Sequence, residues 1–210
     1  MRLPFVSSSE LNPEQRPLYE DMRKGIEASF KGFTAINDAG QLIGPWNPWI
    51  WFPKFGGPVW ELLKSLSLAP TLPRPVREIA ILVTGAHFHA AYEIYAHVLV
   101  AELGGIAEAK IATIVAGQRP SDLTREEATA YDLASALVSG GVLPASSYQQ
   151  AVGLFGEEGT AEFKRWAGGL FALRDADKII PAPEDLDHLN QVERVGDTSI
   201  HTFYIHDEMN

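Results

Sequence analysis

Cysteine is absent from all 210 residues of this chain. Without thiols the protein can form no disulfide framework and no thiolate metal site, and it cannot cycle a thiol during catalysis. The composition therefore excludes a peroxidase that uses its own cysteines. What remains, with 46% hydrophobic residues, is typical of a globular chain with enough apolar material for one core or two small ones.

Basic residues and long hydrophobic runs are also scarce. Lys and Arg number 17 against 27 Asp and Glu, which gives a net charge of -10. A charge of this sign repels nucleic acid phosphates and anionic membrane surfaces, so we expect neither as a partner. No segment has the length of a signal-peptide core or a membrane span, and we therefore expect a soluble, cytoplasmic protein.

The negative charge is concentrated towards the C-terminal end of the sequence. Residues 175–210 carry nine acidic side chains and two basic ones, so most of the net charge lies there. We expect a single domain over residues 1–185, followed by an acidic C-terminal extension over residues 186–210.

The rest of the chain carries many helix signals and few strand signals. Thr124 and Glu127, for example, have the spacing of a capping box. Such a succession of helices with short connections predicts an all-α domain. The segment 32–57 is rich in proline, glycine and tryptophan and lacks helical periodicity, so we expect a long structured loop there. The helices are predicted over about residues 12–31, 58–66, 76–84, 88–103, 106–116, 124–139, 145–155 and 159–173.

The residues that carry chemistry lie in the helix predicted over residues 88–103. Between Ala90 and Ala101 only Glu93 and His97 titrate near neutral pH, and apolar residues occupy every side of the helix. A helix that is apolar all round is buried, and a buried lone carboxylate must find a partner or bind a proton. The i, i+4 spacing places the two side chains on one face. The pair can serve as a catalytic dyad or as a structural ion pair in a core.

His89 lies two helical turns before His97 in the same predicted helix. Eight residues of helix span about 12 Å, whereas zinc ligands lie roughly 2 Å from a shared ion. His89 and His97 therefore cannot readily meet on one metal, and we expect no metal site. We expect His89 instead in the wall of a substrate pocket, or as a hydrogen-bond donor behind that wall.

Five further residues are candidates for the site. Glu78 lies in the first turn of the preceding predicted helix, where a carboxylate also acts as a simple helix cap. Arg77 could hold a substrate carboxylate, because guanidinium binds that group in a bidentate manner, or it could be an exposed cap charge. Tyr92 could bind substrate oxygens. The aromatic residues of the predicted loop, among them Trp49 and Trp51, could line an apolar pocket or serve core and subunit contacts.

The segment from Pro73 to Leu82, followed by Tyr92-Glu93-x3-His97, resembles the carboxymuconolactone decarboxylase family of the alkylhydroperoxidase D-like superfamily. The likeness covers about residues 45–185. It implies an alkylhydroperoxidase D-like helical bundle that assembles as a homo-oligomer built from trimers, and it implies no organic cofactor and no metal.

In the peroxidase branch of that superfamily a glutamate is followed by a Cys-x-x-Cys-x-x-x-His motif. Glu78 matches the glutamate and His97 the histidine, whereas Ala90 and Glu93 occupy the two cysteine positions. The decarboxylase branch has a glutamate at the second of these positions, as this chain does. The resemblance therefore implies an active pocket beside Glu78, Glu93 and His97 that has lost peroxide reduction.

Together these features predict a cofactor-independent lyase or isomerase that acts on a small carboxylated lactone or a related metabolite. Loss of carbon dioxide next to a conjugated lactone carbonyl leaves an enolate, which His97 would protonate as the general acid. Glu93 would orient His97 and share its proton, and Glu78 would support the site from behind. The alternative is a non-catalytic oligomeric binding or scaffold protein on the same fold, with the aromatic loop and the acidic extension as contact surfaces.

Overall fold

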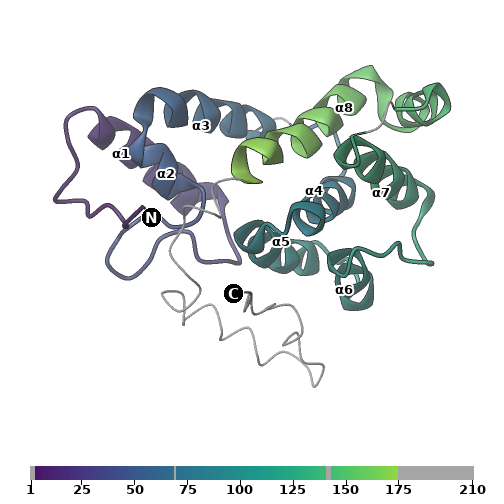
Figure 1. The fold of residues 1–210 in the computed structure, drawn as a ribbon, viewed down its shortest axis with the longest axis horizontal. Coiled ribbons are helices and arrows are strands. Elements are labelled where there is room, and N and C mark those ends of the chain that lie inside the picture. Colours follow the sequence, from purple (N-terminus) through teal and green to yellow (C-terminus); the bar gives the residue numbers. More distant parts are fainter. Residues whose placement is uncertain (1–2, 69, 141–142, 175–210) are drawn as a thin grey trace, which may run out of the picture. The chain divides into compact units, whose positions relative to one another are not determined.

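The computed structural model of the chain describes residues 3–68, 70–140 and 143–174. Outside the helices, these residues form one isolated β-bridge, between Ile36 and Leu42. The all-α prediction is confirmed. The helices in the described ranges are α1 (Gln15–Ser29), α2 (Trp46–Trp51), α3 (Pro53–Leu68), α4 (Arg74–Phe88), α5 (Ala91–Leu103), α6 (Glu108–Val115), α7 (Arg125–Val138) and α8 (Ala145–Arg174) (Figure 1).

The chain divides into two compact units, Met1–Ile180 and Pro181–Asn210. The acidic extension predicted over residues 186–210 lies outside the described residues. None of the helices in the described part of the chain is both long enough and apolar enough to cross a membrane.

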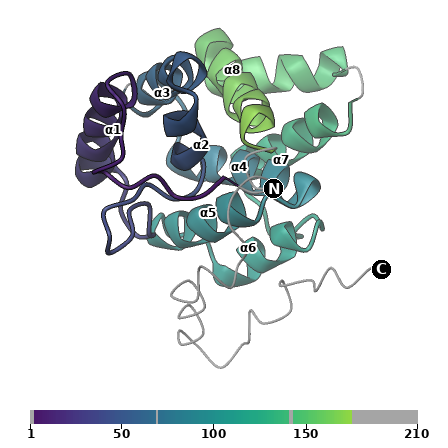
Figure 2. The same cartoon turned by 60° about the vertical axis from the view of Figure 1, so that its left-hand side comes forward.

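The helices pack in two groups (Figure 2). α1, α2 and α3 pack on one another, whereas α4 packs against α5, α6, α7 and α8 and so forms the centre of the second group. The main hydrophobic core lies in this second group. Because α4 is surrounded by other helices, the side chains on it are held by packing on several sides. The largest fully buried core side chains of this group are Val76, Ile79, Leu82, Ile114, Leu133 and Phe163.

Reciprocal hydrogen bonds join Asn12 to Gln15, the first residue of α1, which begins three residues later than the predicted bound at residue 12. Asn12 Oδ1 accepts from the backbone N–H groups of Glu14 and Gln15, each at 2.9 Å, and Gln15 Oε1 accepts from the N–H of Asn12 at 3.0 Å. Backbone donors that have no partner within the helix are thereby satisfied.

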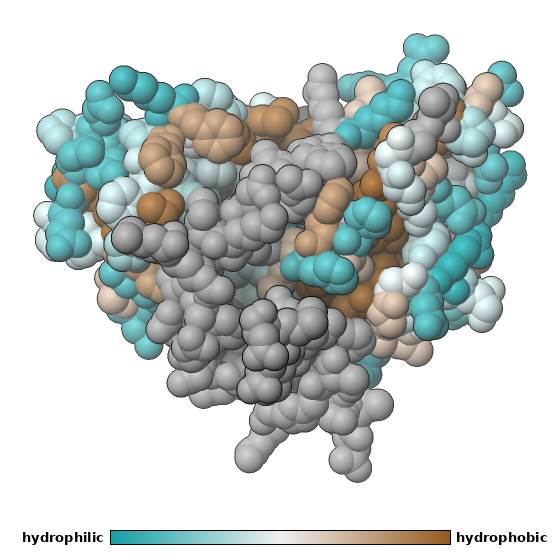
Figure 3. Space-filling model, viewed as in Figure 1, coloured by the Kyte–Doolittle hydropathy of each residue, from teal (hydrophilic) through white to brown (hydrophobic). Residues whose placement is uncertain are grey.

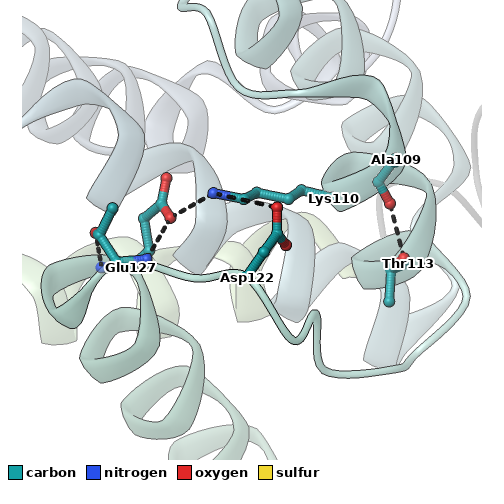
Figure 4. A network of polar contacts seen from close by, with 6 residues as sticks. Ala109, Lys110, Thr113, Asp122 and Glu127 are labelled. Carbon is teal, nitrogen blue, oxygen red and sulfur yellow. Dashed lines mark hydrogen bonds and ion pairs between the residues drawn. The ribbon is translucent and has the colours of Figure 1, made fainter.

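A polar network joins α6 to the start of α7 (Figure 4). The Thr124 hydroxyl accepts from the N–H of Glu127 at 3.2 Å, and Glu127 Oε2 accepts from the N–H of Thr124 at 2.8 Å, which confirms the predicted capping box. Lys110 Nζ on α6 lies 2.8 Å from the same carboxylate and 4.0 Å from Asp122. Glu127 therefore caps its own helix and also holds the neighbouring one.

The prediction of a long loop over residues 32–57 was wrong in its second half. α2 lies within this segment, and α3 begins at Pro53, so that Pro58 is internal to α3 and does not open it. This segment is helical because Trp46 and Trp49 are buried, at only 3% and 2% exposed. Tertiary packing of these side chains overrides the weak helix propensity of the segment. Gly56 allows α3 to pack closely against α2, since a Cβ there would overlap the backbone of Trp49.

The break between α4 and α5 lies four to five residues later than predicted. α4 continues through Gly85 to Phe88, and His89 ends it in the left-handed conformation, with φ 53° and ψ 42°. Gly85 lies inside α4 and faces α5, but a Cβ there would make only an ordinary van der Waals contact with Ile94, at 3.4 Å. His89 consequently does not share a helix with Glu93 and His97.

The last two predicted helices are joined in one long element. α8 runs from Ala145 to Arg174, and Gly156, with φ 70° and ψ 176°, kinks it between the two predicted segments. A positive φ of this kind favours glycine. The two predicted helices are therefore separated by a sharp bend at Gly156 and not by a loop.

Candidate functional site

A cavity of about 520 Å³ is lined by residues from both helix groups. Its volume lies in the range of sites that take drug-sized ligands. The acidic and basic lining residues are Arg74, Arg77 and Glu78 on α4, Glu93 and His97 on α5, and Lys31 just after α1. The remaining wall is largely apolar, and its aromatic members are Phe30, Phe33, Trp46, Trp49, Tyr92 and Trp166.

His97 lies between two buried carboxylates. Its Nδ1 is 2.7 Å from Glu78 Oε2, a hydrogen-bond distance, whereas its Nε2 is 3.6 Å from Glu93 Oε2. Glu78 and Glu93 are only 5% and 6% exposed. The packing of α4 against α5 brings Glu78 within reach of a histidine 19 residues further along the chain.

Burial and charge shift the pKa values of this cluster in a coupled way. Burial raises the pKa of Glu93, the charge of His97 opposes that rise, and the charge of Glu78 adds to it. Burial acts to lower the pKa of His97, but the hydrogen bond to Glu78 and the charges of Glu78 and Glu93 outweigh it, so the pKa of His97 is raised. The cluster therefore favours protonated forms of both His97 and Glu93.

The geometry assigns different tasks to the two nitrogens of His97. A carboxylate only accepts hydrogen bonds, so Nδ1 carries the proton that it donates to Glu78. Nε2 is the nitrogen left to give a proton to a bound molecule or to take one from it. Glu93 lines the same cavity and is close enough to Nε2 to exchange a proton through a bound ligand or solvent molecule.

Arg77 is held in the cavity wall by an aromatic face. The central carbon of its guanidinium lies 5.8 Å from the ring centre of Trp166, and its buried Nε has no hydrogen-bond partner within the part of the chain that the structure describes. Trp166 in turn donates its indole N–H to Glu162 Oε1 at 3.0 Å. The other oxygen of Glu162 accepts from the N–H groups of Thr71 and Leu72, at 2.6 and 3.2 Å.

Tyr92 shapes the cavity wall. It is 5% exposed, and its hydroxyl donates to the backbone carbonyl of Thr34 at 2.7 Å. Its ring meets the ring of Trp46 edge-on at 6.0 Å. Gly44, with φ +63°, packs directly on Tyr92, because a Cβ there would overlap the ring.

Of the residues predicted for the site, the cavity brings together six and leaves out two. His89 does not line it: the side chain is exposed, because the left-handed residue that ends α4 lies outside the helical face of Glu93 and His97. Trp51 does not line it either, and its indole N–H donates to the carbonyl of Pro4 at 2.8 Å, which anchors the N-terminal segment. The six lining residues are Arg77, Glu78, Tyr92, Glu93, His97 and Trp49.

Several lining residues were not singled out from the sequence. Trp46 belongs to the aromatic cluster that the sequence indicates, but Phe30 and Phe33 flank a predicted helix end and carry no distinct signal. Trp166 reaches the cavity from α8 through tertiary packing alone. Glu162 behind it was also missed, although a buried carboxylate within an apolar helix requires donors wherever it occurs.

Comparison with known proteins adds no relative: no protein-family model, no curated protein and no solved structure matches the chain. Among the described residues, no three His, Asp or Glu side chains are grouped in a way that could hold a metal ion. The acidic and basic groups that the cavity offers a ligand are an imidazole, two carboxylates, two guanidinium groups and one ammonium group, set in an aromatic wall.

Proposed function

We propose that the protein is a cofactor-independent lyase or isomerase of the carboxymuconolactone decarboxylase type, acting on a carboxylated lactone or a related acid. The observation that carries the proposal is the 2.7 Å contact between His97 Nδ1 and Glu78, made in the wall of a cavity with Glu93 near the other ring nitrogen. A purely structural ion pair requires no adjoining cavity, whereas a proton-transfer site does.

In the decarboxylation branch of the proposal, the bond between the substrate carboxylate and its neighbouring carbon breaks and carbon dioxide leaves. The electron pair stays on the substrate as an enolate conjugated with the lactone carbonyl. His97 then protonates the carbon through Nε2, and it regains a proton from solvent or from Glu93 before the next turnover. In the isomerisation branch the same groups remove a proton and return it at another carbon.

In this proposal the orienting role moves from Glu93 to Glu78, and Glu93 keeps the proton sharing expected of it from the sequence. Glu78 accepts the hydrogen bond from His97 Nδ1 and so orients the imidazole, the role expected of Glu93. Glu93 is left beside Nε2, where it exchanges protons. The raised pKa of His97 supports this arrangement: burial opposes the imidazolium, but the hydrogen bond to Glu78 and the charges of Glu78 and Glu93 together outweigh it, which favours the protonated acid.

The test is turnover of a panel of carboxylated lactones and aromatic acids, followed by mass spectrometry for loss of carbon dioxide or for an isomer. His97→Ala and Glu93→Gln should each lower the rate by about 100-fold or more while circular dichroism stays unchanged. His87→Ala is the matched control, since this histidine is exposed on α4 and does not line the cavity. A wild-type protein that converts no acid of the panel, or variants with full activity, would contradict the proposal.

A trimer-based homo-oligomer is part of the same proposal. Phe52, Phe55 and Leu103 are 55%, 54% and 65% exposed, and apolar surface gathers over α3 in Figure 3. Large exposed apolar side chains of this kind are typical of contact surfaces. Sedimentation equilibrium should give a mass that is a multiple of three chains, and a monomer at micromolar concentration would contradict it.

The same exposed side chains favour a second candidate, a binding or scaffold protein. Thermal shift separates the two classes, because a ligand stabilises the protein that binds it. Small acids that stabilise the wild type but not His97→Ala support the enzyme. Stabilisation by a protein partner alone supports the scaffold.

A further inference from the structure

Two arginines line the cavity, and neither forms an ion pair within the described part of the chain. Arg74 donates to the carbonyl of Val100 at 3.4 Å, whereas Arg77 has a buried nitrogen without an acceptor among the described residues. Arg77 is half-buried in the cavity wall, and this nitrogen, its Nε, is fully buried. Elsewhere Arg23 pairs with Glu27 and Arg119 with Asp132. A buried donor without a partner costs free energy, and no described side chain neutralises the guanidinium of Arg77. The part of the side chain that is exposed to the cavity is therefore available to an anionic ligand.

The surroundings of Arg77 hold it in place. Its guanidinium packs over Trp166, Trp166 is hydrogen-bonded to Glu162, and Glu162 is fixed by two backbone N–H groups of the α3–α4 connection. A guanidinium stacked on an anchored indole loses less freedom when it binds a ligand than a free side chain does. The fold therefore presents a preorganised cation.

Arg77 also acts on the reacting histidine. Burial is the main influence that lowers the pKa of His97, and the positive charge of Arg77 adds to it. The guanidinium and the imidazole are thus close enough to interact across the cavity that both of them line. A single bound ligand can reach both groups.

The chemistry of carbon dioxide loss indicates which ligand oxygen Arg77 binds. An arginine clamped on the departing carboxylate would stabilise the ground state and oppose the reaction. An arginine on the carbonyl oxygen gains attraction as that oxygen becomes an enolate, so it stabilises the transition state. The second position is the productive one.

We propose that Arg77 is the oxyanion donor of the cavity, binding the oxygen of a flat, conjugated carbonyl compound that ionises to an enolate. The aromatic wall fits a flat ligand: Phe33 and Trp46 stack with centroids 6.3 Å apart, and Trp46 and Tyr92 meet edge to face. The enolate role depends on the proposed function, whereas the anion site itself can be measured without turnover.

The probe is para-nitrophenol, whose phenolate resembles a delocalised planar enolate and differs from the neutral phenol in absorbance. At a pH equal to the pKa of the free phenol, wild-type protein in excess should shift the bound probe towards the phenolate. Arg77→Gln should weaken phenolate binding by about tenfold or more, because a charge-assisted hydrogen bond is lost. Arg119→Gln, which removes an exposed and paired arginine far along the sequence, should leave binding unchanged.

Absence of binding, binding as the neutral phenol, or equal phenolate affinity in Arg77→Gln would overturn the assignment. If circular dichroism shows that this variant misfolds, Arg77→Lys identifies the Nε–H signal of Arg77 in the NMR spectrum by its disappearance. That signal must then move when nitrophenolate is added to the wild type, and a stationary signal would refute the assignment.

The outcomes also separate the two proposals. If carbon dioxide release is lost in His97→Ala but phenolate binding is unchanged in Arg77→Gln, the proposed function stands and the oxyanion site is refuted. Phenolate binding that needs Arg77, in a protein that converts no acid, would keep the anion site and remove both the enzyme and the enolate role.

Discussion

His97 is governed by two carboxylates that act on it unequally. Glu78 adds a hydrogen bond at 2.7 Å to its charge, whereas Glu93 acts at 3.6 Å by charge alone. We therefore expect Glu78→Gln to lower the pKa of His97 more than Glu93→Gln does. NMR titration of the imidazole protons measures both shifts. A larger fall in Glu93→Gln would contradict the assigned hydrogen bond.

Glu93 should make stability depend on pH. Burial raises its folded pKa above the ordinary 4.5, so its contribution is fully present below pH 4.5 and is lost as the pH rises through the folded value. Glu93→Gln carries no such charge. The free energy of unfolding of the wild type should therefore fall relative to the variant as pH rises above 4.5.

Urea unfolding of both proteins between pH 4.5 and 6.5 measures this difference. This range limits the contribution of His97. Burial acts to lower its pKa, but Glu78 and Glu93 together raise it, so the stabilisation from His97 is lost only above pH 6.5. If the unfolding free energy of the wild type, relative to that of Glu93→Gln, stays constant or rises with pH in this range, the folded protein does not raise the pKa of Glu93.

Spacing alone placed Glu93 and His97 on one helical face, and the structure agrees. The contact between His97 and Glu78 could not be predicted in this way, since it depends on how α4 and α5 pack on each other. His89 failed for a related reason. Its place on the helix depended on where α4 ends, and one residue in the left-handed conformation decides that.

At the scale of the elements, the segment before α2 is fitted to α5 through one glycine. Gly44 has φ +63°, and a Cβ there would overlap the Tyr92 ring. Gly117 has φ +73° with nothing within 4 Å of such an atom, so it is a matched control for backbone strain.

Gly44→Ala should therefore cost about 1–3 kcal/mol more than Gly117→Ala, because overpacking is added to the strain of a positive φ. Chemical denaturation of the two variants measures the difference. Equal losses would mean that the Tyr92 ring moves away freely and that this part of the cavity wall is not tightly packed.

The start of α7 was predictable, because the side chains of Thr124 and Glu127 cap its backbone, whereas α1 begins at Gln15, three residues after the predicted bound. α2 was not predictable, because it is only six residues long and contains a proline and three tryptophans. Such a sequence has little helical preference of its own. The buried Trp46 and Trp49 form the helix when they pack against their neighbours.

At the scale of the molecule, the main core is confined to the helices around α4. Phe163 on α8 is 0% exposed within that core, whereas Phe52 is 55% exposed. Phe163→Ala should lower the free energy of unfolding by about 3–5 kcal/mol, and Phe52→Ala by less than about 1 kcal/mol. Urea denaturation tests the contrast, and similar losses would contradict the core boundaries given above.

The cavity draws its walls from two sets of helices that pack mainly among themselves. A molecule bound there contacts both sets of helices. Binding should therefore stabilise the packing of α1–α3 against the rest of the fold. Protection of the α1–α3 amides from hydrogen exchange would rise with saturation, although the only lining residue within α1 itself is its last one, Ser29.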